Sequence, residues 1–156
     1  MESIIFLAQS DTTAGFLSKN HRRLNEIKGR NLGQSVLITL DSLSKLKNLV
    51  RVPECHKNRV RRSKKSSFVY KKSVALKAES LAIRVVFRDF RAVSHADFLR
   101  FFPYLYSSSA NLHKSAFSLE YALKNTDYIV LDNRGLSQNR ASKIYKLSNK
   151  SIKKLR

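Results

Sequence analysis

The sequence predicts an α/β (α+β) fold: a single domain with a twisted mixed β-sheet and helices packed on it. Short apolar runs with strand character alternate with segments of helical periodicity along the whole chain. The length of 156 residues fits one domain, 1–156. Hydrophobic residues make up 42% of the chain, which is a globular composition with enough apolar surface for a core.

The first elements follow from local pattern. The apolar run at Ser3–Ala8 predicts a buried strand, and Ser10–Gly15 predicts a polar turn. Ser18 is the expected N-cap of a helix that runs to about Ile27.

Lys28, Gly29 and Arg30 are expected to end that helix. Gly29 suits the left-handed position after a helix C-terminus. The two flanking cations are favoured there by the helix dipole, so local structure alone can explain them.

The segment from Val36 to Leu40 predicts a second strand. Asp41 or Ser42 is the expected cap of a short helix that continues through Leu49.

A strongly basic run follows. From Arg51 to Lys72 there are nine basic residues and one acid, Glu54, and Ser67–Tyr70 within the run has strand character. Two interpretations remain open: a solvated surface, as for most charge runs, or a surface that contacts phosphates.

The segment Leu81–Phe87 predicts a strand with Arg84 inside it. A buried arginine needs a partner, because an unpaired buried charge is costly. Ser94–Phe102 predicts a helix that starts with Ser94 and Asp97 as a capping box. Its phenylalanines could stack on RNA bases, but their helical spacing favours packing in the core.

The apolar run Phe101–Tyr106 predicts a short buried strand that opens into the polar loop 107–111, Ser-Ser-Ser-Ala-Asn. Hydroxyls and an amide at a strand end offer several hydrogen-bonding groups to a ligand. An ordinary turn is the alternative, since these residues also bond their own backbone.

The last elements are short. Ser118–Lys124 predicts a helix and Tyr128–Leu131 a strand, and Ser142–Tyr145 and Ser151–Ile152 are expected as strands at the end of the sheet. The segment from Arg134 to Arg156 contains eight basic residues and no acid.

Charge is the strongest signal in the composition. Lys and Arg total 31 against 11 Asp and Glu, a formal net charge of +20. This excess predicts a polyanionic partner, with nucleic acid as the first candidate and an anionic membrane surface as the second. A membrane partner is not expected, because no helix pairs a clean apolar face with a basic one and no apolar run reaches 18 residues.

The N-terminal residues carry an acid and no basic region, which is atypical of a signal peptide and predicts a cytoplasmic location. Cys55 is the single cysteine, so no internal disulfide can form. Its neighbour His56 is a weak hint of metal binding, but scattered histidines without a second cysteine predict no metal site.

Several segments together resemble the YrdC-like threonylcarbamoyl-AMP synthase family. Segments similar to the family's Pro-Thr-Asp-Thr-x-Tyr-Gly-Leu, Val-Ala-Val-Arg-Val and Pro-Ser-Thr-Ile motifs occur here in the same order, together with intact matches to Lys-Gly-Arg and Ser/Thr-Ser-Ala-Asn, and an arginine follows. In chain order the corresponding positions are Gln9–Phe16, Lys28–Arg30, Leu81–Val85, Ser108–Asn111, Ala141–Ile144 and Arg156.

The resemblance implies a nucleotidyltransferase that makes threonylcarbamoyl adenylate from L-threonine, bicarbonate and ATP and releases pyrophosphate. The product would serve tRNA modification, so tRNA and other tRNA-modification proteins are implied partners. No protein nucleophile is needed, because the carbamate oxygen attacks the α-phosphate. The protein holds anions together and neutralises charge, and Mg²⁺ is expected to arrive with the triphosphate.

The resemblance also implies roles by position. Lys28 and Arg30 would face the triphosphate and carbamate oxygens, opposite Ser109 and Asn111. These four are the implied catalytic residues. The implied ATP-binding residues are Arg30, Arg84, Asn111 and Arg156. The implied threonine-binding residues are Thr12, Ser109 and Ser142.

The chain also differs from the family pattern. Gln9 and Ala14 replace a proline and a tyrosine, Thr39 replaces a histidine, and His113-Lys114 replaces Ser-Gly. Two alternatives follow. One is a YrdC-like protein that binds double-stranded RNA or tRNA after its catalysis has decayed. The other is a carbamoyl-transfer domain like those of hydrogenase-maturation proteins, which usually accompany cysteine clusters.

Overall fold

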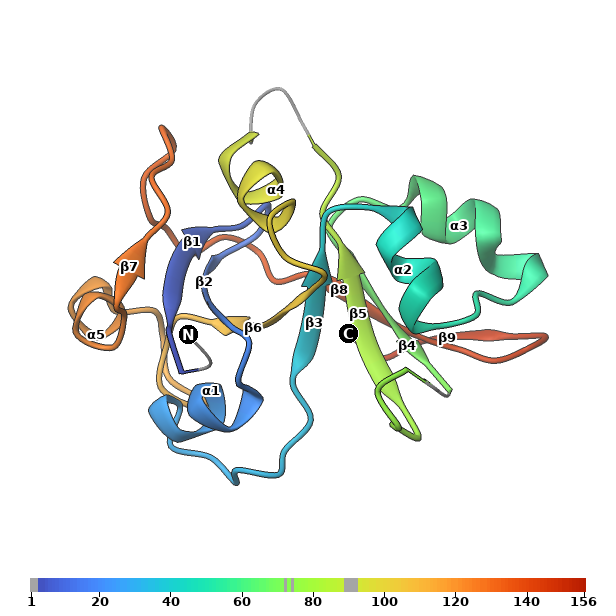
Figure 1. Cartoon of the computed structure of the whole chain (residues 1–156), viewed down its shortest axis with the longest axis horizontal. Coiled ribbons are helices and arrows are strands. Elements are labelled where there is room, and N and C mark those ends of the chain that lie inside the picture. The colour runs from blue at the N-terminus through green and yellow to red at the C-terminus, as the bar shows by residue number, and fades with distance from the viewer. Residues whose placement is uncertain (1–2, 72, 74, 89–92) are drawn as a thin grey trace.

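The computed structural model describes residues 3–71, 73, 75–88 and 93–156. It is an α/β fold with helices packed on a mixed sheet, as the sequence predicted, and the sheet has nine strands in the order β7-β1-β2-β6-β3-β5-β4-β8-β9 (Figure 1). The strands are β1 Phe6–Gln9, β2 Ala14–Ser18, β3 Leu37–Leu40, β4 Ser66–Tyr70, β5 Leu81–Val85, β6 Leu105–Ser109, β7 Tyr128–Ile129, β8 Lys143–Leu147 and β9 Ile152–Lys154. The helices are α1 His21–Ile27, α2 Leu43–Leu49, the 3₁₀ turn η1 Glu54–His56, α3 Lys57–Arg62, α4 Val93–Leu99 and α5 Leu119–Lys124.

Strand β6 joins the two halves of the sheet. It runs antiparallel to both of its neighbours, with Ser108 opposite Phe16 of β2 and Ser107 opposite Leu37 of β3. The three serines therefore lie within a strand, and the prediction of a polar loop directly after Tyr106 was wrong. Backbone pairing on both sides outweighs the turn preference of serine.

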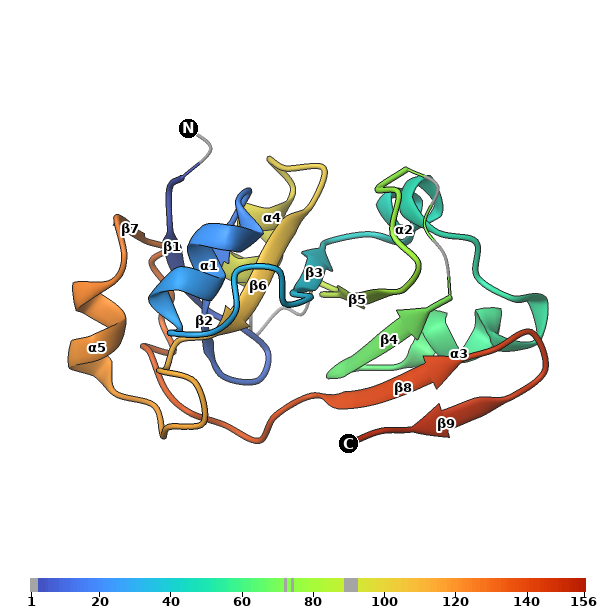
Figure 2. The same cartoon turned by 90° about the horizontal axis from the view of Figure 1, so that it is seen from below.

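Helices α1, α4 and α5 pack on the β1–β2 half of the sheet, and helices α2 and α3 pack on the other half (Figure 2). On the β1–β2 half, Leu24 of α1 and Ala122 of α5 pack with Phe16 on one face. Helix α4 packs against the other face through Leu99, which shares a cluster with Leu17. On the second half, α2 and α3 supply side chains to one core cluster with Ile38, Val60, Leu46, Phe68 and Ile83.

Capping residues define several predicted helix ends. Ser42 caps α2 by accepting from Lys45 N, and Ser118 caps α5 by accepting from Tyr121 N. Gly29 has the predicted left-handed conformation, with φ of +61°. These ends were predictable because each depends on residues only a few positions apart.

The region before α1 differs from the prediction. The segment Ala14–Ser18 is strand β2, hydrogen-bonded to β1 and β6, and the expected turn covers only residues 10–13. Asn20 caps α1 instead of Ser18, whose hydroxyl donates to Ile4 O at 2.8 Å. A glycine suits this position in the strand because β6 passes very close to it.

The helix predicted at Ser94–Phe102 is observed as α4, which starts one residue earlier and ends at Leu99. Helix α4 begins at Val93, so Ser94 lies inside its first turn and does not cap it. Phe98 and Phe102 pack against Phe6, which confirms the core prediction for these two. Phe101 is 83% exposed, so the prediction was wrong for that ring.

The basic run contains a helix that the sequence did not predict. Helix α3 buries one side chain, Val60, and leaves its cations exposed. Lys72, at the end of the run, lies outside the described residues. Among the described residues, no helix has both the length and the apolar character that crossing a membrane requires.

Candidate active site

A cavity of about 660 Å³ lies where the two halves of the sheet meet. Its wall includes residues of β2, β3, β5 and β6, the end of α1 and the segment before β8. All eight residues that the resemblance implied as site residues line it: Thr12, Lys28, Arg30, Arg84, Ser109, Asn111, Ser142 and Arg156. Segments more than a hundred positions apart thus contribute to one hollow, of a size typical of nucleotide and cofactor pockets.

The Lys28 ammonium joins the end of α1 to the loop after β6. It donates to Ser109 O at 2.8 Å, Asn111 O at 2.6 Å and Asn111 Oδ1 at 3.0 Å. The side chain lies at a buried helix end, since Lys28 is only 3% exposed. Burial and the nearby Arg30 charge lower the pKa of Lys28 to about 8.

The backbone around Lys28 is shaped to present this side chain. Gly29 turns the chain out of the helix in the left-handed conformation, and its N–H donates to Glu26 O at 2.9 Å. Arg30 N donates to Asn25 O at 3.1 Å. These bonds satisfy carbonyls at the helix end, as in other glycine-terminated helices.

Asn25 holds Arg30 at the cavity. The Asn25 side chain accepts from Arg30 Nε at 2.5 Å and donates to Leu32 O and Gln34 O at 2.9 and 2.8 Å. Asn25 is fully buried on α1, although the sequence analysis gave it no role. A polar residue among the inward-facing positions of a helix was the available signal.

Arg84 has the partner that its position in a strand required. It forms an ion pair with Asp11, and its Nη1 donates to Thr12 Oγ1 at 3.0 Å. Burial, together with the charge of Arg156, lowers the pKa of Arg84 to about 10. Arg84 thus orients the 10–13 loop at the cavity wall.

The residues near the C-terminus complete the wall. Arg156 Nε donates to Ser142 O at 3.2 Å, and the hydroxyls of Ser142 and Ser67 lie 3.2 Å apart. Ser142 is buried and Arg156 is exposed.

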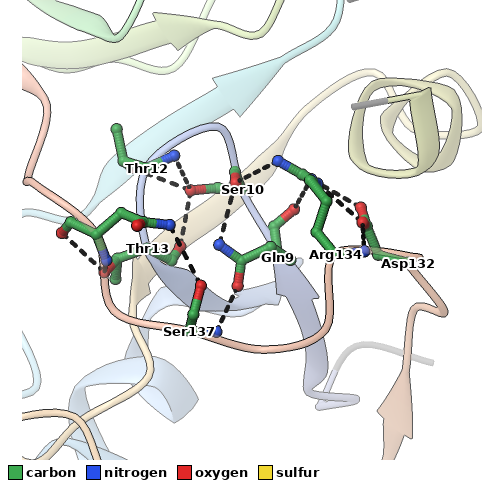
Figure 3. A network of polar contacts seen from close by, with 8 residues as sticks. Gln9, Ser10, Thr12, Thr13, Asp132, Arg134 and Ser137 are labelled. Carbon is green, nitrogen blue, oxygen red and sulfur yellow. Dashed lines mark hydrogen bonds and ion pairs between the residues drawn. The ribbon is translucent and has the colours of Figure 1, made fainter. Parts of the chain in front are cut away.

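Residues of the segment that follows β7 form hydrogen bonds with the 10–13 loop and the end of β1 (Figure 3). Arg134 donates to Ser10 O at 3.1 Å and to Gln9 O at 2.9 Å, and it pairs with Asp132 at 2.7 Å. Gln9 Oε1 accepts from Ser137 N at 2.8 Å. Hydrogen bonds from Arg134 lower the pKa of the Asp132 carboxyl.

Solved structures share this architecture. The P. abyssi Sua5 structure complexed with L-threonine is similar with a TM-score of 0.77 and 19% identity, over 99% of this chain and 50% of that chain. Full-length HypF in its phosphate- and nucleotide-bound form gives a TM-score of 0.76 at 15% identity, over 99% and 27%. E. coli YciO gives a TM-score of 0.67 at 14% identity, over 97% and 82%.

The chain has the YrdC-like fold. It spans half the length of the Sua5 chain that it matches. No protein-family model matches the sequence, and no curated protein matches it either. The resemblance inferred from short motifs is therefore confirmed by the structure at the level of the fold.

In this YrdC-like fold the cavity is strongly cationic. The described lining holds six Lys and Arg side chains and no Asp or Glu: Lys28, Arg30, Arg84, Lys114, Arg140 and Arg156. Asp11 lies behind the wall, paired with Arg84. Such a hollow attracts a ligand with several negative charges and cannot by itself supply carboxylate ligands to a metal ion.

Cys55 and His56 both contact backbone carbonyls of the turn between β8 and β9. Cys55 is exposed and its thiol donates to Asn149 O at 3.3 Å, whereas His56 lies 3.0 Å from Ser148 O and 3.1 Å from Ser151 O. No group of three potential metal ligands occurs among His, Cys, Asp and Glu of the described residues. His56 instead holds the turn between β8 and β9.

Proposed function

We propose that this chain is a threonylcarbamoyl-AMP synthase that converts L-threonine, bicarbonate and ATP to threonylcarbamoyl adenylate and pyrophosphate. The observation that carries the proposal is the contact of Lys28 with Ser109 and Asn111 in a cationic cavity of nucleotide size. The likeness to Sua5 solved with L-threonine and to HypF solved with nucleotide and phosphate supports it.

The residue types suit this chemistry. Carbamate attack on the α-phosphate brings two anions together, and fixed cations lower that electrostatic barrier. Arg30 is partly exposed at the cavity, so it can contact phosphate oxygens directly. Hydroxyl and amide groups of Ser109 and Asn111 can orient the carbamate without competing as nucleophiles.

A magnesium ion would be held mainly by the triphosphate. The described lining offers hydroxyl and carbonyl oxygens but no carboxylate, which fits an ion that stays coordinated by phosphate and water. The ion would neutralise phosphate charge. Lys28, Arg30 and Arg156 would position the phosphates around it.

The direct test is pyrophosphate release from ATP in the presence of L-threonine and bicarbonate. We expect release that requires both small substrates and falls at least 100-fold in Arg30→Ala. Arg22→Ala is the matched control, because Arg22 is an exposed arginine on α1, away from the cavity lining. Folded protein that releases no pyrophosphate, or releases it without L-threonine, would contradict the proposal.

A second candidate function is binding of double-stranded RNA or tRNA. Six exposed cations lie on α3 and the turn that follows it: Lys57, Arg59, Arg61, Arg62, Lys64 and Lys65. We call this set the α3 basic surface. Within the part of the chain that the structure describes, Lys57 alone of this set is paired with an acid, Glu54. A steep fall of RNA affinity with added salt would support phosphate contact at this surface.

A further inference from the structure

Among the described residues, the buried polar atoms without a hydrogen-bond partner include Thr39 Oγ1, Arg84 Nε and His95 Nδ1, and two of these residues, Arg84 and His95, line the cavity. Their residues are only 1%, 6% and 3% exposed. Buried polar groups in proteins are nearly always bonded to protein, ordered water or a ligand. A cluster of unpartnered ones beside a cavity therefore indicates a place that a ligand group or a water completes.

The fold brings these three residues together. Thr39 of β3 and Arg84 of β5 are register partners in a parallel pair. Their neighbours Ile38 and Ile83 belong to the core cluster beneath α2 and α3. Because side chains alternate along a strand, Thr39 and Arg84 point to the opposite face, where Arg84 lines the cavity. His95 enters the same wall from α4.

The hydrogen-bonding character of the cluster is mixed. Arg84 Nε can only donate, whereas the Thr39 hydroxyl can donate or accept. Burial and the charges of Arg84 and Arg134 lower the pKa of His95 to about 3, against a raising effect of Asp132. The imidazole is thus neutral near pH 7, so one of its nitrogens can accept. A hydroxyl, which both accepts and donates, matches this set better than a methyl group or a second cation.

We propose that Thr39, Arg84 and His95 form an inner subsite that binds a hydroxyl group of a substrate in the cavity. The inference rests on the proposed function, under which two hydroxyl sources exist: the side chain of L-threonine and the ribose of ATP. L-valine is the isostere of L-threonine without the hydroxyl, and 2′- and 3′-deoxy-ATP lack one ribose hydroxyl each. A site built to bond a hydroxyl discriminates against such analogues far more strongly than an apolar pocket does.

The experiment compares kcat/KM for pyrophosphate release between L-threonine and L-valine, and between ATP and each deoxy-ATP. The proteins are the wild type, Thr39→Val and His95→Phe, with His113→Phe as control because His113 is exposed at the same cavity. We expect the wild type and the control to prefer one hydroxylated substrate by about 100-fold or more. Each subsite variant should reduce that preference to below about 10-fold, mainly by raising KM for the hydroxylated substrate.

The substrate pair for which the variants lose the wild-type preference identifies the hydroxyl that the subsite binds. Equilibrium binding of the same compounds and the melting temperature of Thr39→Val provide readouts that do not depend on turnover. Thr39→Val keeps the shape and removes an unpartnered hydroxyl, so its melting temperature should not fall. A purely structural role of Thr39 predicts the reverse pattern: lower stability with unchanged substrate preference.

Three results would overturn the inference. If both variants keep the wild-type preference for every pair, the polar atoms bind water only. If the wild type uses hydroxylated and deoxy substrates equally, no hydroxyl is recognised, although threonine-dependent turnover would still support the proposed function. If the wild type neither binds L-threonine nor releases pyrophosphate with it, the proposed function fails and the inference fails with it.

Discussion

Lys28 shows how one side chain can connect distant parts of a site. Its ammonium has three donors, and three acceptors of Ser109 and Asn111 lie within 3.0 Å. The charge therefore shapes the loop that follows β6 as well as the field in the cavity. Removing the side chain would leave the Ser109 and Asn111 carbonyls without this donor, so Arg30→Ala is the cleaner test of charge in the proposed reaction.

Under the proposed function, the lowered pKa of Lys28 predicts a pH dependence of ATP binding. As pH rises from 7 to 9, Lys28 passes its pKa of about 8 and loses its charge. We expect ATP affinity to fall several-fold over this range because the cavity loses a cation. Calorimetric titration across this pH range measures the effect. Lys28→Met should bind weakly throughout, without the same step.

The same shift predicts the opposite trend for stability. Between pH 8 and 10.5 the unfolded chain holds a proton on Lys28 that the folded chain has lost. The free energy of unfolding attributable to Lys28 therefore rises with pH in this window. Denaturant titrations of the wild type and Lys28→Met, compared at each pH, isolate this contribution. A difference that does not change with pH would contradict the low pKa.

His95 predicts sensitivity to acid. Its pKa is about 3 in the folded protein because it is buried near Arg84 and Arg134, with Asp132 as the opposing charge, against an ordinary value of 6.5. Below pH 6.5 the unfolded chain binds the proton more readily, so stability falls as pH decreases. The loss attributable to His95 at pH 4 is roughly 3 kcal/mol. In His95→Phe the unfolding free energy should fall less between pH 7 and pH 4, by roughly this amount, as denaturant titrations at the two pH values would measure.

At the scale of elements, the site depends on how closely β2 approaches β6. A Cβ on Gly15 would lie 3.0 Å from the backbone oxygen of Ser108, a distance that real Cβ atoms rarely show. The glycine in β2 therefore permits the register that places Ser109 near Lys28. This close approach also explains why a glycine occurs within a strand that the sequence did not predict.

Gly15→Ala tests this interpretation. We expect a loss of about 1–3 kcal/mol in unfolding free energy, because two backbones must separate, together with weaker ATP binding as β6 shifts. Gly33→Ala is the control, since its added Cβ would meet only the Asn31 side chain at 3.3 Å. Equal effects of the two substitutions in thermal unfolding would argue against a tight β2–β6 contact.

At the scale of the whole molecule, two kinds of surface lie apart. The end of the sheet that carries α5 and β7 exposes apolar side chains, whereas α3 and β9 lie toward the other end (Figure 1). Exposed apolar residues at the first end include Leu119, Leu123, Tyr128, Ile129 and Leu131. The α3 basic surface consists of Lys and Arg alone, and the helix that carries it buries one apolar side chain, Val60. This surface suits phosphate contact better than base stacking.

None of the six cations of the α3 basic surface lines the cavity, which predicts that RNA binding and pyrophosphate release can be impaired separately. Arg59→Glu with Arg62→Glu should weaken binding of double-stranded RNA at least tenfold at low salt, and pyrophosphate release should be unchanged. Arg30→Ala should reduce pyrophosphate release and leave binding of double-stranded RNA unchanged. Filter binding over a range of salt concentrations measures the RNA effect. Loss of RNA binding in Arg30→Ala alone would assign the RNA to the cavity.

The sequence by itself determined features that depend on near neighbours. The strand at β5, the left-handed Gly29 and the caps at Ser42 and Ser118 follow from residues within one or two turns of each other. The motif order also indicated the YrdC-like fold, and every matched segment contributes residues to the cavity.

Only the tertiary structure decided which groups meet. Lys28 is buried because it packs against Ser109, which lies 81 positions away in the sequence and within hydrogen-bond distance in space. Arg84 finds Thr12 across 72 positions, and Arg134 reaches Ser10 across 124. Such contacts depend on sheet order and register, and hydrogen-bonding capacity read from a sequence does not specify which distant partner will use it.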